Sequence, residues 1–152
     1  MSRTVYLDMG GKSSEKLLED LAGIPQGHVL VIDASHSGYV TDTLLHDCPT
    51  HQTKPKYGMY KFLSDSSVLN IHGISLSTYT LPTNRPNVTL LPTSSYAPLL
   101  LEKQSVCTMN HRRFLTLLQQ LLERDAKGFA HVLLDTSPTL DLLTQLAIVA
   151  ST

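Results

Sequence analysis

Two continuous apolar runs, each followed by an aspartate, constrain the fold of this chain most strongly. The first is His28–Ile32, which reads HVLVI and precedes Asp33, and the second is His131–Leu134, which reads HVLL and precedes Asp135. Continuous apolarity, as opposed to alternation, is typical of strands that are covered on both faces, as in a parallel sheet. The two runs therefore predict two buried strands whose carboxyl ends carry an acidic side chain.

Segments with a strand or helix pattern alternate along the rest of the chain. Two shorter runs predict strands at Thr4–Leu7 and Asn87–Leu91. Helical spacing of apolar residues predicts helices at Ser14–Ala22, Val40–Leu45, Tyr57–Leu63, His111–Arg124 and Leu140–Ala150. Cys48–Lys56 is expected to be an exposed loop, and Val68–Tyr79 is ambiguous. Strands that alternate with helices predict an α/β fold with a mainly parallel sheet flanked by helices.

The composition limits what the chain does. With 152 residues, 41% of them hydrophobic and 16% charged, the chain suits one packed domain. The formal net charge of -1 provides no overall attraction to nucleic acid or to an anionic membrane. No apolar run reaches the roughly 18 residues that a membrane-spanning helix needs. The N-terminus lacks a signal-peptide pattern and the two cysteines are far apart, so we expect a cytoplasmic protein.

A glycine-lysine-serine turn follows the first predicted strand. Gly10–Ser14 reads GGKSS and precedes a predicted helix. Phosphate binding at such a place uses backbone N–H groups at a helix N-terminus, small residues that let the phosphates approach, and a lysine that meets their charge. Gly11-Lys12-Ser13 matches the last three positions of the phosphate-loop motif GxxxxGK[ST], but Tyr6 stands at its first glycine. Taken alone, the triplet also fits an ordinary glycine turn with a helix cap.

The two aspartates stand where an open parallel sheet binds ligands, beyond the carboxyl ends of its strands. Asp135 ends the run VLLD. An aspartate of this kind usually orients water on Mg²⁺ from the strand next to the phosphate loop, although a residue that only caps a turn gives the same pattern. Asp33 ends a buried strand, where a carboxylate is costly unless it has a partner. Each signal is modest, and their order along the chain is what makes them specific.

The combination resembles the ParA/MinD family of deviant Walker ATPases, which partition plasmids and chromosomes or position cell-division machinery. Residues 21–45, LAGIPQGHVLVIDASHSGYVTDTLL, are similar to the family stretch whose strand ends in DxDPQGxxT. Residues 131–152, HVLLDTSPTLDLLTQLAIVAST, are similar to its Walker B segment, hhhDxPPxLxxLTxxAhhAxD, and residues 87–95, NVTLLPTSS, to its LxLLPA segment. The resemblance covers the chain from about Gly10 to Thr152, and it implies a P-loop NTPase-like fold.

The resemblance also implies a role for individual residues. Lys12 contacts the β- and γ-phosphates of ATP and acts in catalysis, and Ser14 contacts the α-phosphate. Ser13 and Asp135 hold Mg²⁺, the latter as the Walker B carboxylate. Asp33 lies in the first switch, near the magnesium ion and its waters, as the second catalytic residue. The implied nucleotide-binding residues are Gly10, Gly11, Lys12, Ser13 and Ser14.

Departures from the family pattern predict weak or lost ATP hydrolysis. Leu7 stands where the family has the signature lysine that reaches the partner's phosphates across a dimer. Asp8 and Met9 replace two glycines of the phosphate loop, and Ser35 replaces the second aspartate of DxD. Loss of a water-positioning group typically lowers the rate by roughly 10²–10⁴-fold. We expect residues 1–152 to form a single P-loop NTPase-like domain without the C-terminal part of the family fold.

Several functions agree with these residues. One is a ParA/MinD-like nucleotide-binding protein of plasmid or chromosome partitioning or of intracellular positioning, with ATP and Mg²⁺ as cofactors, a homodimer as one assembly, and a protein partner that stimulates it or is recruited. Nucleic acid as a partner is unsupported by the net charge. The alternatives are a non-catalytic pseudo-ATPase interaction or scaffold domain, a bacterial tyrosine kinase-like P-loop domain, and a small α/β domain whose GKS is coincidental.

Overall fold

The structure is a computed structural model that describes residues 4–8, 28–34, 39–46, 48, 58–66, 71–92, 111–136 and 142–151. Within these residues, five strands form one sheet in the order β1-β5-β2-β4-β3. The strands are β1 (Thr4–Asp8), β2 (His28–Ala34), β3 (Leu81–Pro82), β4 (Val88–Leu91) and β5 (Phe129–Thr136). The pairs β1–β5, β5–β2 and β2–β4 are parallel, and β3 pairs with β4 in the antiparallel direction. The predicted, mainly parallel sheet is therefore confirmed.

The four predicted strands are present: β1, β2 and β5 are longer than expected, and β4 is one residue shorter. β2 continues past Ile32 to Ala34, and β5 begins at Phe129 and ends at Thr136, because their pairing extends to the Ala34–Thr136 row. The short strand β3 was not predicted. Two residues are too few for a periodic pattern, and Pro82 belongs to a strand at the edge of the sheet, where a missing N–H donor is tolerated.

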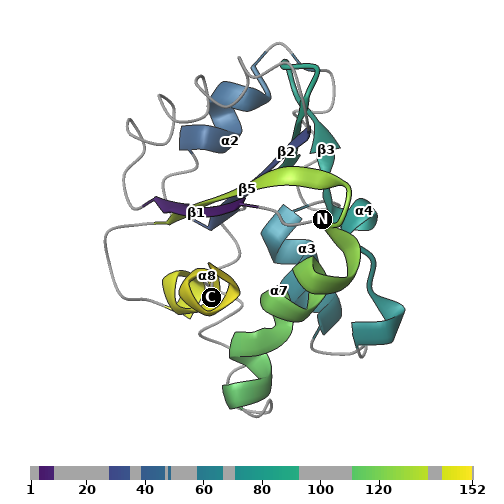
Figure 1. The fold of residues 1–152 in the computed structure, drawn as a ribbon, viewed down its shortest axis with the longest axis vertical. Coiled ribbons are helices and arrows are strands. Elements are labelled where there is room, and N and C mark those ends of the chain that lie inside the picture. Colours follow the sequence, from purple (N-terminus) through teal and green to yellow (C-terminus); the bar gives the residue numbers. More distant parts are fainter. Residues whose placement is uncertain are drawn as a thin grey trace.

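Helices connect the strands and cover both faces of the sheet (Figure 1). They are α2 (Tyr39–Leu44), α3 (Gly58–Ser66), α4 (Leu76–Tyr79), α7 (His111–Asp125) and α8 (Leu142–Ser151), together with the 3₁₀ turn η3 (Ile71–Gly73). The predictions for α2, α3, α7 and α8 are confirmed, with ends that shift by a few residues. The ambiguous segment Val68–Tyr79 contains η3 and α4. The predicted helix Ser14–Ala22 lies outside the described residues, as does most of the predicted loop Cys48–Lys56.

Two hydrophobic cores pack on opposite faces of the sheet. Val29 and Val31 of β2 belong to the core beneath α2, whereas Leu30 and Ile32 belong to the core formed with α3, α4, α7 and α8. The alternating side chains of one strand thus enter both cores, which is the reason its sequence is apolar without interruption. α7 and α8 pack against each other on the second face. None of the described helices is long and apolar enough to cross a bilayer.

The short helix α4 is anchored in the larger core by its last residue. The ring of Tyr79 packs edge-to-face on Phe62 of α3, with ring centroids 5.8 Å apart. The Tyr79 hydroxyl donates a hydrogen bond of 2.9 Å to the Asp65 carboxylate, which also pairs with Lys61 at 3.0 Å. Burial raises the pKa of the Tyr79 phenol well above its ordinary value, and the neighbouring Asp65 carboxylate raises it further. These contacts hold the residues before β3 on α3.

Candidate functional site at the carboxyl ends of the strands

Three neighbouring strands carry an aspartate as their last or next-to-last residue, and these aspartates lie in one row of the sheet. Asp8 of β1 is the register partner of Asp135 of β5, and Asp135 is the register partner of Asp33 of β2. Because neighbouring strands lie about 4.8 Å apart, the row places three acidic residues close together. The prediction that Asp33 and Asp135 meet at one edge of the sheet is confirmed, and Asp8 ends the strand beside them.

Asp33 is fully buried and is bound by the first turn of α2. Its Oδ2 accepts hydrogen bonds from the backbone N–H of Thr41 at 3.1 Å and from the Thr41 hydroxyl at 2.7 Å. The exposed fraction is 0% for Asp33 and 5% for Thr41. A carboxylate that caps an amide in the first turn of a helix satisfies a donor that has no partner within the helix. The cost of burying the Asp33 carboxylate is thus partly offset by donors from the neighbouring helix.

Asp135 lies on the same face of the sheet as Asp33. Leu133 and Val31 belong to the core beneath α2, and side chains two residues apart in a strand point to the same face. Asp135 and the following Thr136 are 1% and 2% exposed. The two buried carboxylates are therefore presented side by side at the end of the sheet that borders α2.

The predicted phosphate loop begins at this edge. Gly10, Gly11, Lys12, Ser13 and Ser14 lie outside the described residues. Their position along the chain is nevertheless informative, because β1 ends at Asp8, only two residues before Gly10, and is paired with the strand that carries Asp135. The expectation that the aspartate of VLLD lies on the strand next to the phosphate-loop strand is met.

The donors at this edge suit magnesium bound together with phosphates. Among the described side chains, no group of three or more His, Cys, Asp or Glu residues is close enough to hold a metal ion. Mg²⁺ generally keeps several waters and binds through one or two carboxylates and the phosphates of a substrate, so it needs no such group. At the carboxyl ends of the strands, Asp135 supplies one buried carboxylate of this kind.

A glycine at the start of α3 packs tightly against the end of β4. Gly58 has a φ of 84°, and a Cβ placed there would lie 2.3 Å from the carbonyl oxygen of Pro92. The next residue, Met59, donates its N–H to the same oxygen at 2.8 Å. Pro92 directly follows β4, so α3 also begins at the carboxyl end of a strand, beside the β2 strand that carries Asp33.

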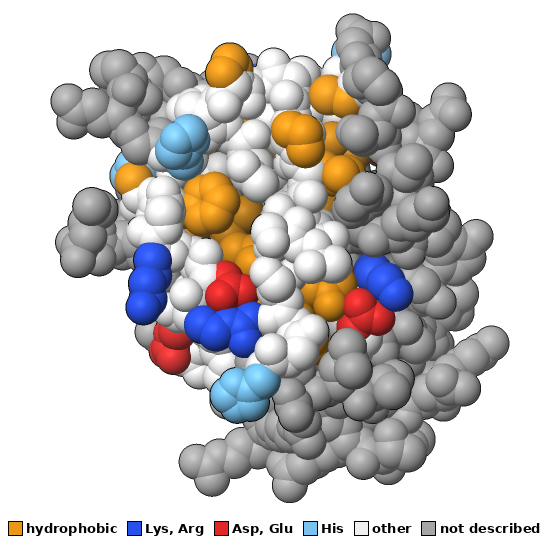
Figure 2. Space-filling model, turned by 90° about the vertical axis from the view of Figure 1, so that its right-hand side faces the viewer, with side chains coloured by type: hydrophobic (Ala, Val, Ile, Leu, Met, Phe, Trp, Pro, Cys, Tyr) orange, Lys and Arg blue, Asp and Glu red, His pale blue; other side chains and the backbone are white. Residues whose placement is uncertain are grey.

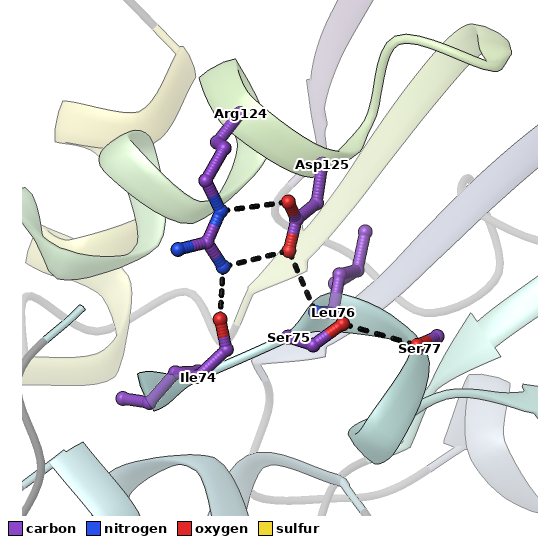
Figure 3. A network of polar contacts seen from close by, with 6 residues as sticks. All are labelled: Ile74, Ser75, Leu76, Ser77, Arg124 and Asp125. Atoms are coloured by element: carbon purple, nitrogen blue, oxygen red, sulfur yellow. Dashed lines mark hydrogen bonds and ion pairs between the residues drawn. The ribbon is translucent and has the colours of Figure 1, made fainter. Parts of the chain in front are cut away.

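A second polar cluster lies elsewhere, where the end of α7, the start of β5 and the residues before α4 meet (Figure 3). The guanidinium of Arg124 pairs with the Asp125 carboxylate, Nε to Oδ1 at 2.7 Å and a terminal nitrogen to Oδ2 at 2.8 Å. Arg124 also donates to the carbonyl of Ile74, and Asp125 Oδ2 accepts the N–H of Leu76 at 2.9 Å. Together the two side chains bind a carbonyl that precedes α4 and the amide of the first residue of α4.

This cluster borders a shallow hollow of about 400 Å³ whose lining is Ser75, Leu76, Ser77, Thr80, Arg124, Asp125 and Phe129. On the face drawn in Figure 2, the described basic side chains each lie close to an acidic one, so positive charge does not gather there.

The sequence did not predict the cluster of Arg124 and Asp125. The charges of Arg124 and Asp125 end an amphipathic helix, a place where charged residues are common, and their partners lie 50 and 49 residues earlier.

The arrangement defines a class of protein. A mainly parallel sheet with helices on both faces, in which the strand before a GKSS turn is paired with a strand that ends in aspartate, is a P-loop NTPase-like α/β fold. No protein-family model and no curated protein sequence matches the chain.

Solved structures share this fold across almost the whole chain. A plasmid partition protein from Borrelia burgdorferi matches with a TM-score of 0.76 and 16% identity, over 99% of this chain and 62% of that protein. Cobyrinic acid a,c-diamide synthase from Mycobacterium smegmatis, with bound ADP and magnesium, matches with a TM-score of 0.73 and 20% identity, over 99% and 57%. A McdA variant from Cyanothece in complex with ATP matches with a TM-score of 0.72 and 16% identity, over 98% and 53%.

These similarities establish the fold, and the predicted ParA/MinD-type fold is therefore confirmed. The chain spans between about one half and two thirds of the length of each of these three structures.

Proposed function

We propose that this chain is a ParA/MinD-like nucleotide-binding protein, which takes up ATP with Mg²⁺ at the carboxyl ends of β1, β5 and β2. The observation that carries the proposal is the parallel pairing of β1, which precedes GGKSS in the sequence, with β5, whose next-to-last residue is Asp135. The fold is shared with a structure that contains ADP and magnesium and with one that contains ATP. In an open parallel sheet, this edge is the general place for a ligand.

In this proposal each residue of the site has a defined task. The backbone N–H groups of Gly10 and Gly11 and the N-terminus of the following helix bind phosphate oxygens, Lys12 meets the charge of the β- and γ-phosphates, and Ser14 contacts the α-phosphate. Ser13 and Asp135 hold Mg²⁺, which supplies charge neutralisation between the phosphates. Asp33 lies near the waters of the ion. The residues Lys12 and Asp33 carry whatever catalysis the chain performs.

Hydrolysis is proposed to be weak or lost. The chain has Leu7 in place of the signature lysine and Ser35 in place of the second aspartate of the first switch. Asp8 lies directly beside Asp135 in the register of the sheet, so that two acidic residues flank the start of the phosphate loop. At an effective dielectric constant of about 20, a carboxylate a few ångströms from a phosphate repels it by several kcal/mol before screening.

The cellular role that we propose is partitioning of a plasmid or chromosome, or positioning of another cargo, in the cytoplasm. The support is the fold shared with a plasmid partition protein and with McdA. A protein partner then stimulates the chain or is recruited by it, and a homodimer is the expected assembly. Residues 1–152 constitute one P-loop NTPase-like domain in this proposal.

Isothermal titration calorimetry with ATP and with ADP, each in Mg²⁺ and in EDTA, tests the proposal. We expect Mg²⁺-dependent binding to the wild-type chain. Lys12→Ala removes one charge-assisted contact and should weaken binding about 10- to 100-fold, whereas Asp135→Asn should abolish the enhancement by Mg²⁺. The matched controls are Lys16→Ala, a lysine of the predicted first helix, and Asp42→Asn, an exposed acidic residue of α2. Both controls should bind as the wild type does.

A second candidate function is a pseudo-ATPase interaction or scaffold domain. The observation that favours it is the Asp8–Asp135 register, because two neighbouring carboxylates repel phosphates unless a cation lies between them. An absence of binding at millimolar ATP, with and without Mg²⁺, would reject the nucleotide-binding proposal and favour the scaffold. In that case Asp8→Gly, which restores the family residue and removes this repulsion, should recover part of the binding.

A further inference from the structure

We propose that Thr41 is a positioning residue, which orients the Asp33 carboxylate at the magnesium-nucleotide site. This inference rests on the proposed function and adds a residue to which no role has been assigned. It starts from the two hydrogen bonds that Thr41 donates to a single oxygen of Asp33, from its N–H at 3.1 Å and from its hydroxyl at 2.7 Å. Both residues are buried, so water does not compete strongly for these bonds.

The two hydrogen bonds restrict the orientation of the carboxylate. The torsion that turns a carboxylate about its Cβ–Cγ bond has broad minima, so a strand position alone leaves this orientation open. Two donors from one residue, an amide that belongs to a helix and a hydroxyl on a β-branched side chain with few rotamers, remove that freedom. Oδ2 of Asp33 is thereby committed to α2, and the carboxylate is held in a fixed relation to its register partner Asp135.

Thr41 also connects the end of β2 to the start of α2. Asp33 is the next-to-last residue of the strand and Thr41 lies in the first turn of the helix, eight residues later. The contact therefore ties the end of the strand to the start of the helix, which borders the row of aspartates. A change of the hydroxyl alters the orientation of Asp33 without touching the carboxylates themselves.

The magnitude of the effect follows from the behaviour of groups around metal ions. Mg²⁺ demands near-ideal octahedral geometry and keeps several of its waters, which neighbouring carboxylates orient. Loss of an outer partner of a metal ligand typically lowers metal affinity about 10- to 100-fold, and Thr41 acts one step further from the ion, through Asp33. Because Thr41→Val retains the backbone N–H and the shape of the side chain, we expect the lower end of this range, about tenfold.

The experiment measures ATP affinity by calorimetry in Mg²⁺ and in EDTA for the wild type, Thr41→Val, Thr41→Ser and Thr43→Val. Thr41→Val should reduce the Mg²⁺ enhancement of ATP binding about tenfold and leave the affinity in EDTA within a factor of two. Thr41→Ser keeps a hydroxyl and should retain most of the enhancement. Thr43→Val is the matched control, since Thr43 is a half-buried threonine of the same helix, and it should match the wild type.

A double variant tests whether Thr41 acts through Asp33. Asp33→Asn combined with Thr41→Val should show no larger loss of Mg²⁺ enhancement than Asp33→Asn alone, because the two residues belong to one contact. Thr41→Ala replaces Thr41→Val if valine prevents folding. A merely structural role of Thr41 would weaken binding equally in Mg²⁺ and in EDTA.

The outcomes separate this inference from the proposed function. If the wild type shows Mg²⁺-dependent binding and both Thr41→Val and Thr41→Ala keep its full enhancement, the positioning role is wrong and the proposed function stands. If the wild type binds no nucleotide, or binds it without regard to Mg²⁺, the proposed site itself is wrong and the positioning role is rejected together with it.

Discussion

Aspartates have different bonding partners in two regions of the molecule, the carboxyl ends of the strands and the junction of α7 with β5. At the first, Asp33 is fully buried and accepts hydrogen bonds from the neutral amide and hydroxyl of Thr41. At the second, Asp125 is half-buried and pairs with both the Nε and a terminal nitrogen of Arg124, while it also accepts the amide of Leu76. The Asp33 carboxylate is bound by neutral hydrogen-bond donors, whereas the Asp125 carboxylate is paired with the cationic guanidinium of Arg124.

This difference distinguishes the proposed nucleotide site at the strand ends from the Arg124–Asp125 pair, a contact that holds the fold together. An Arg–carboxylate pair that also binds a carbonyl and an amide of a distant segment joins two parts of the fold, and it is satisfied without a ligand. The row of acidic residues at the strand ends is the place where the proposed function puts a magnesium ion and the phosphates of a nucleotide. Substitutions in the two regions should therefore have different consequences, and the following measurements compare them.

The largest effect on stability is expected from a substitution of Gly58. Gly58→Ala should lower the free energy of unfolding by about 3 kcal/mol, because a side chain at positive φ is strained and the new Cβ would overlap the Pro92 carbonyl. Gly128, at the junction of α7 with β5, is the matched control, since a Cβ there meets nothing within 4 Å. Gly128→Ala should change the free energy of unfolding by less than about 0.5 kcal/mol. Urea denaturation checks both, and an equal cost at the two positions would contradict the tight packing at the strand end.

The second effect concerns the buried carboxylate. Asp33→Ala should lower the free energy of unfolding by about 2 kcal/mol, because the amide and the hydroxyl of Thr41 lose their buried acceptor. Asp42→Ala on the exposed side of α2 provides the control and should cost less than about 0.5 kcal/mol. If the two substitutions cost the same in urea denaturation, the contact between Asp33 and Thr41 does not stabilise the fold.

The smallest effect is expected at the ion pair, and it should depend on pH. The hydrogen bonds from Arg124 lower the pKa of Asp125, partial burial opposes this shift, and the amide of Leu76 adds to it. Because the pKa of Asp125 is lower in the folded state, its contribution to stability is present above the unfolded pKa, near 3.8, and is lost as the pH falls through the folded pKa. Asp125→Asn should thus cost about 1 kcal/mol at pH 7.

At strongly acidic pH, the difference between the wild type and Asp125→Asn should shrink, since both side chains are then uncharged. Glu123→Gln, at an exposed neighbouring position of α7, is the control and should leave the pH dependence unchanged. A cost for Asp125→Asn that grows as the pH falls would show that the pair with Arg124 is not what stabilises this junction.

Much of the fold could be predicted because its strands and helices have clear local patterns. The uninterrupted run of β2 identified a strand buried on both faces, and the spacing of Leu117, Leu118, Leu121 and Leu122 identified the buried side of α7. For the site, the two apolar runs predict Asp33 and Asp135 near the carboxyl ends of β2 and β5. The segment before β3 could not be predicted, because η3 and α4 are three and four residues long and are held by contacts with α3 and α7.

The sequence by itself determined the α/β class and the two buried strands that carry Asp33 and Asp135 near their carboxyl ends, because each depends on neighbouring residues and on burial that follows the period of one element. Only the tertiary structure decided that β5 is inserted between β1 and β2, which brings Asp135 beside both Asp8 and Asp33. It also decided that Thr41 binds Asp33 and that Arg124 and Asp125 bind the backbone at the start of α4. Such contacts join elements that are distant in the chain, and a local pattern records that a residue is buried but not which residue covers it.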